Sequence, residues 1–346
     1  MDDVEPFGSE PADGAGPAGP PPIEHFDDGV IAIDTLTAGL EKVTAGYLLD
    51  APRPTLVECG PALTVDAVLR GLAALGLDPD DLAYLVVTHI HLDHAGGAGD
   101  VAAAFPDATV VVSDVGARHL HDPTKLNASS QRVYGPLFEQ IYGPCTPIEQ
   151  QRILGVADGH RLDLGGGREL ELLYTPGHAK HHIGVFDPSI GAVFSGDSVG
   201  IKVPGMRRIR PATPPPDFHL EASLASIAAY RDRRPDSLYL AHYGPVDPPD
   251  EALAEASDRL RLWTEVADTA YAQVRGRGEE HELEHVAETL ARRFADDLGG
   301  DAGATAGDQE HLHAARVEVL SDPRANAAGL LRYFKRRDEG TLTPTG

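Results

Sequence analysis

The seven residues Thr88-His-Ile-His-Leu-Asp-His94 directly follow the apolar run Leu82 to Val87, which is short, β-branched and flanked by polar turns. Such a run predicts a buried strand. The small residues that come next, Ala95 to Ala104, predict the start of a helix with a glycine-rich first turn. Because a strand-to-helix loop lets several side chains converge without strain, we expect this stretch to build a site.

Four of the seven residues are good ligands for a borderline metal such as zinc: His89, His91, Asp93 and His94. Side chains at positions i and i+2 of an extended segment point the same way, so His89 and His91 can share one ion. Asp93 and His94 follow them and are expected to turn toward a second ion. The spacing therefore predicts two adjacent metals rather than one closed tetrahedral site.

The chain has 346 residues, of which 42% are hydrophobic, and this is enough for one large domain plus a smaller one. Its two cysteines, Cys59 and Cys145, imply no disulfide framework and favour a reducing compartment. No apolar run is long enough to span a bilayer, and the acidic N-terminus does not resemble a secretory signal. We therefore predict a soluble, cytoplasmic protein without a membrane partner.

The formal net charge is −25, from 54 acidic and 29 basic residues, and only five of the basic residues are lysine. This excess disfavours nucleic acid as a partner, because a phosphate backbone would be repelled over most of the surface. It fits a protein kept soluble at high salt, where screening weakens self-repulsion, and so favours a halophilic source. An acidic protein from an arginine-favouring genome is the alternative, and the sequence leaves both open.

Residues 1–22 are rich in Pro, Gly, Ala and Asp, with few large apolar groups, and we predict that they form a disordered tail. From Val30 the pattern becomes one of strands and helices. Strands are predicted over 30–34, 45–50, 55–60 and 109–113, and helices over 64–75 and 114–120. Residues 122–152 form a long polar and aromatic insertion, which is more typical of a wall or lid than of an idle loop.

In the second half of the chain, predicted strands repeatedly end at a potential ligand. His178 follows the strand 169–174, Asp197 follows the strand 192–195, and His242 follows the strand 237–241. Strand ends from several places in the chain converge when an α/β sandwich builds a site. We therefore expect these three residues to lie near the first four.

Together these residues resemble the metallo-β-lactamase superfamily, whose His-x-His-x-Asp-His signature matches His89 to His94. The later histidines and the aspartate of the family match His178, Asp197 and His242. The resemblance covers residues 24–248 and implies an α/β (α+β) fold, an αββα sandwich of two packed sheets with helices outside. A catalytic domain is accordingly predicted over residues 23–248.

The resemblance also implies a role for each ligand. The first metal is assigned to His89, His91 and His178, the second to Asp93, His94 and His242, and the bridge between them to Asp197 together with a hydroxide. Two Zn²⁺ are expected, because three protein ligands per ion leave a position open for water, although iron or manganese fits the same ligands. Such a pair lowers the pKa of water and polarises a substrate oxygen. Asp93, which can take or donate a proton, and Asp197 are the predicted catalytic side chains.

Within the superfamily the chain looks most like the glyoxalase II-like hydrolases, whose Thr-Pro-Gly-His-Thr-x-Gly-His motif resembles Thr175 to His182. After the aspartate those thioesterases continue into Phe-x-x-Gly-x-Gly-Arg, whereas this chain has Ser198 to Met206. The substrate pocket is therefore expected to differ from that of glutathione thioesterases. Other stretches, such as Val57 to Pro61, resemble an archaeal and bacterial branch of these hydrolases without an assigned substrate.

Several residues are candidates for contacts around the metals. His182 and Tyr243 are expected beside the ligands or the substrate, with His182 supporting a ligand rather than binding metal. Three arginines either anchor a substrate carboxylate or phosphate, or pair with surface carboxylates: Arg207, Arg208 and Arg210. The remaining histidine pairs are predicted to be solvated surface residues: His119 and His121, His281 and His285, and His311 and His313.

Residues 249–346 predict helices, with apolar positions at spacings of three and four that include Trp263. They either cap the metals and shape the pocket or form the contact of a homodimer. The sequence as a whole predicts an enzyme, a binuclear metallo-hydrolase that cleaves an ester-like bond, such as a thioester or lactone, in a small-molecule substrate.

Three alternatives to this hydrolase stay open. The first is a persulfide dioxygenase with one iron at His89, His178 and Asp197, and the intact ligands of the second metal count against it. The second is a nuclease or phosphodiesterase, which the charge balance opposes. The third is a non-catalytic binding module. A metal assay separates the dioxygenase from the hydrolase, because one iron without zinc contradicts the hydrolase.

Overall fold

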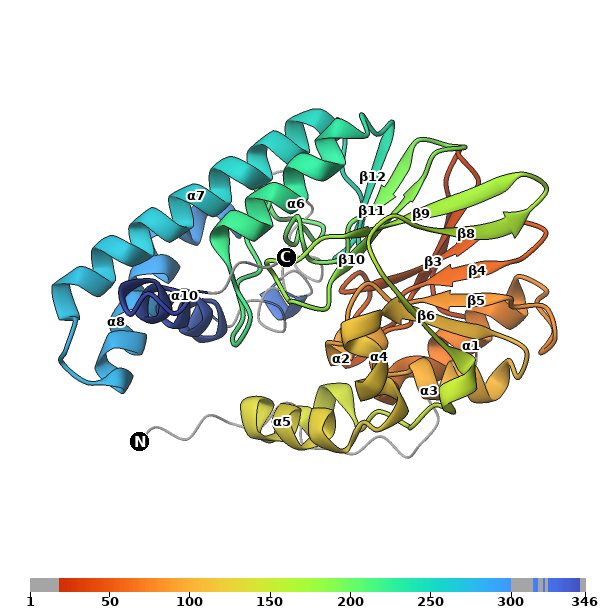
Figure 1. The fold of residues 1–346 in the computed structure, drawn as a ribbon, viewed down its shortest axis with the longest axis horizontal. Helices are drawn as coiled ribbons and strands as arrows, with labels where there is room; N and C mark the ends of the chain where they lie inside the picture. Colours follow the sequence, from red (N-terminus) through yellow and green to blue (C-terminus); the bar gives the residue numbers. More distant parts are fainter. Residues whose placement is uncertain (1–18, 300–313, 317–319, 321–322, 343–346) are drawn as a thin grey trace.

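This computed structural model describes residues 19–299, 314–316, 320 and 323–342. Two β-sheets pack face to face, and helices cover the outer face of each sheet (Figure 1). This arrangement is the four-layer αββα sandwich with a C-terminal helical extension that the sequence predicts. The prediction of the fold class is confirmed.

The first sheet has seven strands within the described residues, and they lie side by side in chain order. β1 to β4 pair antiparallel, and β4 to β7 pair parallel. The strands are β1 (Ile23–His25), β2 (Val30–Asp34), β3 (Ala45–Leu49), β4 (Thr55–Val57), β5 (Tyr84–Val86), β6 (Thr109–Ser113) and β7 (Ile153–Val156). The parallel half places the ends of β4, β5 and β6 at one edge of the sheet.

The second sheet has six strands within the described residues, in the order β13-β12-β11-β10-β9-β8. β11 and β12 are parallel, and the other neighbours are antiparallel. The strands are β8 (His160–Gly165), β9 (Arg168–Tyr174), β10 (Ile183–Asp187), β11 (Ala192–Phe194), β12 (Ser237–Leu240) and β13 (Gly244–Pro245). The candidate ligands His178, Asp197 and His242 come after the ends of β9, β11 and β12.

The side chains of the strands contribute to two kinds of core, one between the two sheets and one between each sheet and the helices outside it. Successive side chains of a strand point to opposite faces. In β5, Leu85 therefore lies under the helices while Val86 faces the second sheet. Phe194 of β11 and Tyr239 of β12 face the first sheet, and their rings stack 5.1 Å apart. Burial on both faces explains why these strands are continuous apolar runs.

The helices of the first half pack on the first sheet or belong to the ligand stretch and the insertion. They are α1 (Val65–Ala74), α2 (Leu92–Ala95), α3 (Ala98–Ala104), α4 (Asp114–His121) and α5 (Thr124–Tyr134), with the short turns η1 (Thr37–Gly39), η2 (Ala62–Thr64), η3 (Phe138–Tyr142) and η4 (Gln150–Arg152). The insertion 122–152 thus contains α5, η3 and η4. Phe138 and Cys145 of the insertion pack on Leu92 of the ligand stretch.

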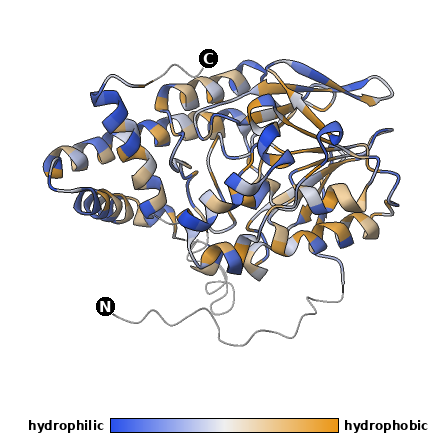
Figure 2. Ribbon diagram, turned by 60° about the horizontal axis from the view of Figure 1, so that its bottom comes forward, coloured by the Kyte–Doolittle hydropathy of each residue, from blue (hydrophilic) through white to orange (hydrophobic). Residues whose placement is uncertain are grey.

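The remaining helices form one group that begins on the outer face of the second sheet and extends away from it (Figure 1). They are α6 (Leu220–Asp232), α7 (Pro249–Val274), α8 (Glu279–Arg293), the turn η5 (Ala295–Asp297) and α10 (Pro323–Asp338). Their apolar residues form one core with Leu173, Val193 and Leu238 of the sheet, and Trp263 stacks on Phe294 with ring centroids 4.7 Å apart. Hydrophilic and hydrophobic residues alternate along these helices, as amphipathic packing requires (Figure 2).

Some elements differ from the prediction or were absent from it. Within the helix predicted over 95–104, α3 begins only at Ala98, and the preceding short helix α2 ends at Ala95. β1, β7 and α6 were not predicted. Of the predicted tail, residues 1–18 lie outside the described residues, whereas the carbonyl of Pro22 accepts the N–H of Asp34 at 3.0 Å. Among the helices of the described residues, none is long and apolar enough to cross a membrane.

Candidate metal centre

All seven predicted ligands follow the C-terminal ends of strands, and these ends meet between the two sheets. The ligand stretch follows β5 of the first sheet, and the other ligands follow β9, β11 and β12 of the second sheet: His89, His91, Asp93 and His94 in the stretch, then His178, Asp197 and His242. The parallel order of β4 to β6, and of β11 with β12, brings these ends together because parallel strands end at the same edge.

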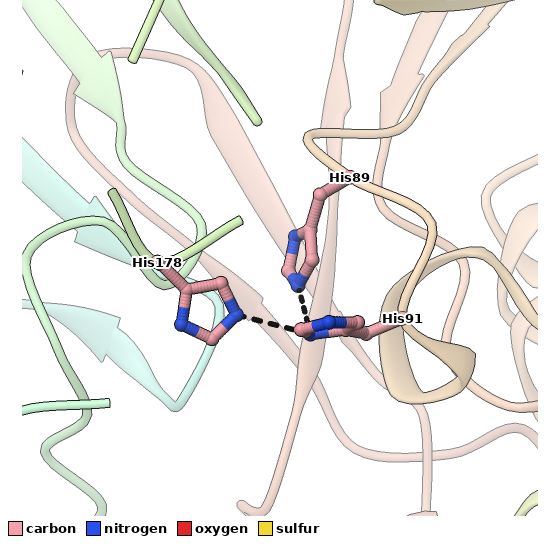
Figure 3. A group of neighbouring side chains, drawn as sticks. All are labelled: His89, His91 and His178. Carbon is pink, nitrogen blue, oxygen red and sulfur yellow. Dashed lines mark hydrogen bonds between the residues drawn. The ribbon is translucent and has the colours of Figure 1, made fainter. Parts of the chain in front are cut away.

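Three imidazoles form the first triad, which consists of His89, His91 and His178. Nε2 of His89 lies 2.9 Å from Nδ1 of His91, and Nε2 of His178 lies 3.0 Å from the same Nδ1. Figure 3 shows the three rings directed at one another from two different segments. One nitrogen of each ring lies within 4.8 Å of the other two, the spacing at which three ligands can hold one ion.

The second triad consists of Asp93, His94 and His242, whose ligand atoms also lie within 4.8 Å of one another. Oδ2 of Asp93 lies 3.6 Å from Nε2 of His94 and 3.4 Å from Nε2 of His242. Asp197 stands between the triads. Its Oδ1 is 3.4 Å from Nε2 of both His94 and His242, and its Oδ2 is 3.6 Å from Nε2 of His178.

The residues present fit a pair of divalent cations. Nε2 of His94 and Oδ1 of Asp197 are buried, and neither makes a hydrogen bond within the described part of the chain. Buried polar atoms are rarely left without a partner, so both are placed as ligands would be. Imidazole nitrogens and carboxylate oxygens suit zinc and its neighbours in the first transition row, and three ligands per triad leave a position open.

Each of three imidazoles is fixed through the nitrogen that faces away from the centre. Nδ1 of His94 donates to Oε1 of Glu58 at 3.1 Å, Nδ1 of His178 donates to the Ala212 carbonyl at 3.0 Å, and Nδ1 of His242 donates to the Val43 carbonyl at 3.0 Å. A proton held at Nδ1 leaves a lone pair at Nε2 to bind metal.

Glu58 was not predicted as a site residue. It follows β4, its carboxylate accepts the Thr88 hydroxyl and the Thr88 N–H (3.2 Å), and it also binds His94. Its φ of +68° is unusual for a residue other than glycine, and these buried contacts hold the backbone there. The signal in the sequence is the same as for the ligands, an acidic residue directly after an apolar strand.

Burial and neighbouring charges shift the pKa values of the two triads in different directions. Burial lowers the pKa of His89 far below its usual value and that of His91 to about 3. Burial also acts against a charge on His94, but the Asp197 carboxylate outweighs it and raises the pKa of His94 well above its usual value. Burial would raise the pKa of Asp197, yet His242 and His94 outweigh burial and hold that pKa well below its usual range. Near neutral pH the first triad is therefore uncharged and open to a cation.

His182, which the sequence analysis expects to support a ligand, contacts the backbone of Asp197. Its Nε2 accepts the backbone N–H of Asp197 at 3.2 Å, so its Nδ1 carries the proton and donates to the Thr175 hydroxyl at 2.9 Å. His181, the neighbour of His182, accepts the N–H of Ile90 at 3.4 Å on Nδ1. Both histidines therefore tie the turn that carries His178 to the segments that carry the other ligands.

The other candidates are Tyr243, which directly follows the ligand His242 in the chain, and the three arginines. Tyr243 is buried, and its hydroxyl has no hydrogen-bond partner among the described residues. The three arginines contact the helical extension. The backbone N–H of Arg207 donates to the Asp297 carbonyl at 3.0 Å, and the guanidinium of Arg208 lies 3.7 Å from the Glu255 carboxylate. The guanidinium of the buried Arg210 lies 5.1 Å from the centre of the Trp263 ring. Among these three contacts, that of Arg208 with Glu255 is a pairing with a carboxylate.

The remaining histidine pairs lie apart from the centre. His119 lies next to the Arg118 guanidinium at 3.2 Å, and Nδ1 of the exposed His121 donates to the Ile148 carbonyl at 3.0 Å. The rings of His281 and His285 are 6.4 Å apart on α8. His311 and His313 lie outside the described residues.

The chain is similar to proteins of one superfamily. A family model described as Metallo-beta-lactamase superfamily matches residues 39–242. A metallo-beta-lactamase fold-containing protein of Sulfurisphaera tokodaii is 32% identical over 216 residues, which are 61% of this chain and 80% of that protein. The crystal structure of an archaeal metallo-beta-lactamase superfamily protein from Sulfolobus tokodaii has a TM-score of 0.59 at 21% identity, over 88% of this chain and 98% of that one.

Two shorter matches carry enzyme names. A hydroxyacylglutathione hydrolase of Legionella pneumophila is 27% identical over 118 residues, 34% of this chain and 34% of that protein. An N-acyl homoserine lactonase of Agrobacterium fabrum is 32% identical over 111 residues, 32% of this chain and 38% of that protein. These two matches span about a third of each protein, whereas the family model spans more than half of this chain. The chain belongs to the metallo-β-lactamase superfamily.

Proposed function

We propose that this protein is a binuclear metal-dependent hydrolase that cleaves an ester-like bond, a thioester or a lactone, in a small molecule. The observation that carries the proposal is the position of Asp197. One of its oxygens lies 3.4 Å from His94 and His242, and the other lies 3.6 Å from His178. A carboxylate that faces both triads is placed to hold two ions close together.

When bound, two divalent cations supply Lewis acidity and lower the pKa of an attacking water. The chain's own residues set the geometry around that chemistry. Glu58, Ala212 and Val43 orient the imidazoles of His94, His178 and His242, as the distances above describe. Because these contacts are made in the folded protein before substrate arrives, the ligands need little reorganisation.

Asp93 is the carboxylate placed to handle a proton for the leaving group. Its side chain is 19% exposed, compared with 8% for that of Asp197, and its Oδ2 lies 3.4 Å from Nε2 of His242. His91 is also partly exposed, whereas His89 is fully buried. A substrate therefore approaches from the side of His91 and Asp93.

The insertion 122–152 supports a substrate wall on this side. Phe138 and Cys145 of the insertion pack on Leu92, which stands between His91 and Asp93. The insertion also presents the exposed apolar residues Val133 and Leu137. We infer that this segment shapes the entrance to the centre and contacts the part of the substrate that does not react.

Two relatives with enzyme names support the choice of an ester-like bond. One is named a hydroxyacylglutathione hydrolase and the other an N-acyl homoserine lactonase, and each matches about a third of this chain. The net charge of −25 opposes a polyanionic substrate such as nucleic acid.

The test combines metal analysis with a substrate panel. Purified protein is analysed for bound metals by mass spectrometry and then assayed with thioesters, lactones and phosphodiesters. We expect two ions per chain and hydrolysis of a thioester or a lactone, lost on treatment with a chelator and restored by Zn²⁺. One iron per chain without zinc, together with no hydrolysis in the reconstituted protein, contradicts the proposal.

A further inference from the structure

The helix α10 lies against the loop 212–221 and contacts it from one face. Asn326, Gly329 and Tyr333 make these contacts, and their spacing of three and four residues places them on the same side of the helix. α10 packs on α8 and α7, at a distance from the strands of the second sheet (Figure 1). The sequence analysis assigned these helices to a cap or a dimer contact and named no link to the ligands.

The strongest contact joins Asn326 to Thr213, and both residues are buried. Oδ1 of Asn326 accepts the backbone N–H of Thr213 at 2.6 Å. The Thr213 hydroxyl lies 3.0 Å from the same Oδ1 and 3.1 Å from the Asn326 carbonyl, and it can donate to either. Removal of the Asn326 amide would leave the buried N–H of Thr213 without this partner, and an unpaired polar group away from water is costly.

Three further contacts extend this docking along the loop. A Cβ on Gly329 would collide with the carbonyl oxygen of Thr213, so only glycine lets the helix approach so closely. Nε of Arg332 donates to the Pro216 carbonyl at 3.1 Å. The Tyr333 hydroxyl donates to Glu221 at 2.8 Å. The helix therefore fixes the loop from residue 213 to the first turn of α6.

The same loop holds His178 from two sides. The carbonyl of Ala212, the residue before Thr213, accepts from Nδ1 of the His178 ring at 3.0 Å. At the other end, the N–H of His219 donates to the carbonyl of Gly177 at 2.9 Å. Gly177 has a φ of +131° and no space for a Cβ beside Ser223, so the turn before His178 is seated tightly on α6.

We propose that Asn326 of α10 is a positioning residue for the first metal position. It fixes Thr213, and through Thr213 it fixes the Ala212 carbonyl that orients the His178 ring. Outer partners of metal-binding histidines set the ring orientation and the basicity of the ligand nitrogen, and so they set metal affinity. The inference rests on the proposed function only in taking His178 as a ligand.

The experiment titrates metal-free Asn326→Ala with Zn²⁺ in competition with a chromophoric chelator. We expect the affinity of one of the two positions to fall roughly ten- to hundredfold, as it does when an outer partner of a ligand is removed, while the other position changes by less than about threefold. His178→Ala identifies the affected position. In the His178→Ala background, adding Asn326→Ala should change neither affinity further, because non-additive effects mark residues that act through each other.

Arg337→Ala is the matched control. Arg337 lies on the same helix, but its guanidinium binds Asp268 of α7 through two contacts, of 2.8 and 3.0 Å, and does not touch the loop. This variant should lower the melting temperature and leave both Zn²⁺ affinities within about twofold of wild type, because distant sites act independently. A general loss of stability from α10 would instead weaken metal binding in both variants, and that outcome overturns the proposal.

Thr213→Val serves as the milder variant if Asn326→Ala does not fold. It keeps the volume and the backbone contact of Thr213 and removes only the hydroxyl, so it should weaken the same position less. Unchanged Zn²⁺ affinities in a folded Asn326→Ala or, failing that, in Thr213→Val overturn the inference. Wild-type protein that binds no Zn²⁺, or a single ion, contradicts the proposed function itself, so the two failures are distinct.

Discussion

Asp197 is the carboxylate that faces both triads. Asp197→Asn keeps the shape of the residue but removes its charge and weakens one of its two contacts with the triads. Because the carboxylate is a main electrostatic stabiliser of the centre, we expect kcat to fall about a hundredfold or more. The measurement is a kinetic assay with the best substrate of the panel.

Asp187→Asn is the control for this change. Asp187 is also a buried aspartate at a strand end, but it pairs with Arg168 at 2.7 Å and belongs to neither triad. We expect this variant to lose stability and to keep its metals. Retention of more than about a third of the activity by Asp197→Asn would mean that the two-metal arrangement does not drive hydrolysis.

Glu58→Gln tests the outer contact of His94. Glutamine keeps the size of the side chain and removes the charge that Nδ1 of His94 faces at 3.1 Å. The Zn²⁺ affinity of the second triad should fall roughly tenfold or more, as is usual for a carboxylate behind a metal-binding histidine. The control is Glu24→Gln. Glu24 lies on β1 and pairs with Lys42, and its replacement should leave the Zn²⁺ affinity of the second triad unchanged. Equal affinities in both variants would show that the Glu58 charge does not support the ligand.

The residues of the centre that the sequence reveals differ from those it does not reveal in how far along the chain their partners lie. His89 to His94 stand in one segment, and their spacing alone indicates a metal site. Glu58 meets Thr88 only because β4 and β5 pair in parallel, which joins residues 30 positions apart. Likewise, the carbonyls of Ala212 and Val43 have no side-chain signature, so only the fold reveals that they orient histidines.

Asp34 closes a segment that supports the centre. It ends β2, and its carboxylate accepts the N–H groups of Leu36 at 2.9 Å and Lys42 at 2.7 Å. The segment so closed contains Val43, whose carbonyl accepts from His242. Burial raises the pKa of Asp34 from 3.8 to about 6, the charge of Glu41 adds to this, and Arg316 and the two N–H groups oppose it.

The raised pKa of Asp34 gives a pH-dependent stability. The folded protein holds the proton more tightly than the unfolded chain, so the contribution to stability is present at acid pH and lost as the pH rises through about 6. Relative to Asp34→Asn, which cannot ionise, the wild-type protein should lose about 3 kcal/mol of unfolding free energy between about pH 4 and pH 7. Urea unfolding of both proteins at the two pH values measures this. An equal difference at both would contradict the raised pKa.

The secondary-structure predictions succeeded where the apolar pattern was strong. α7 and α8 have apolar positions at helical spacing along many turns, and both were predicted. α6 was missed because its buried face is made largely of small residues such as Ala222, Ser223 and Ser226, which give little contrast in hydropathy. β1 and β7 were missed because they are short strands at the two edges of the first sheet.

For the whole molecule, the net charge of −25 predicts that salt stabilises the fold. Raising the salt from 0.1 M to 1 M shortens the Debye length from about 10 Å to about 3 Å and weakens the repulsion among the excess carboxylates. We expect the melting temperature of the metal-loaded protein, followed by circular dichroism, to rise by at least about 2 °C.

The shape of the salt dependence is part of this prediction. Most of the rise should be complete near 1 M, since screening saturates, whereas exclusion of salt from the protein surface would continue to act above it. A melting temperature that falls with salt would mean that ion pairs outweigh the net charge. The halophilic interpretation and the alternative of an acidic protein from an arginine-favouring genome share this net charge, so both predict the rise.

The arrangement of whole layers followed from the family resemblance, but the place of the C-terminal helices did not. The sequence indicates which face of each helix is apolar, yet it does not indicate which surface that face covers. α7, α8 and α10 pack on one another, and their apolar residues form one core with the second sheet. Because the contact between Asn326 and Thr213 joins residues 113 positions apart, no local pattern predicts it.

The position of α10 in the sequence has a consequence for biosynthesis. A ribosome makes every metal ligand, through His242, before it makes Pro323, the first residue of α10. At about 5–20 residues per second, several seconds separate the two. During that interval the nascent chain contains all seven ligands, but the loop that orients His178 is not yet held by α10. Tight loading of the first position therefore waits until translation has passed α10, and truncated chains are expected to reach the cell's proteases in a poorly metallated state.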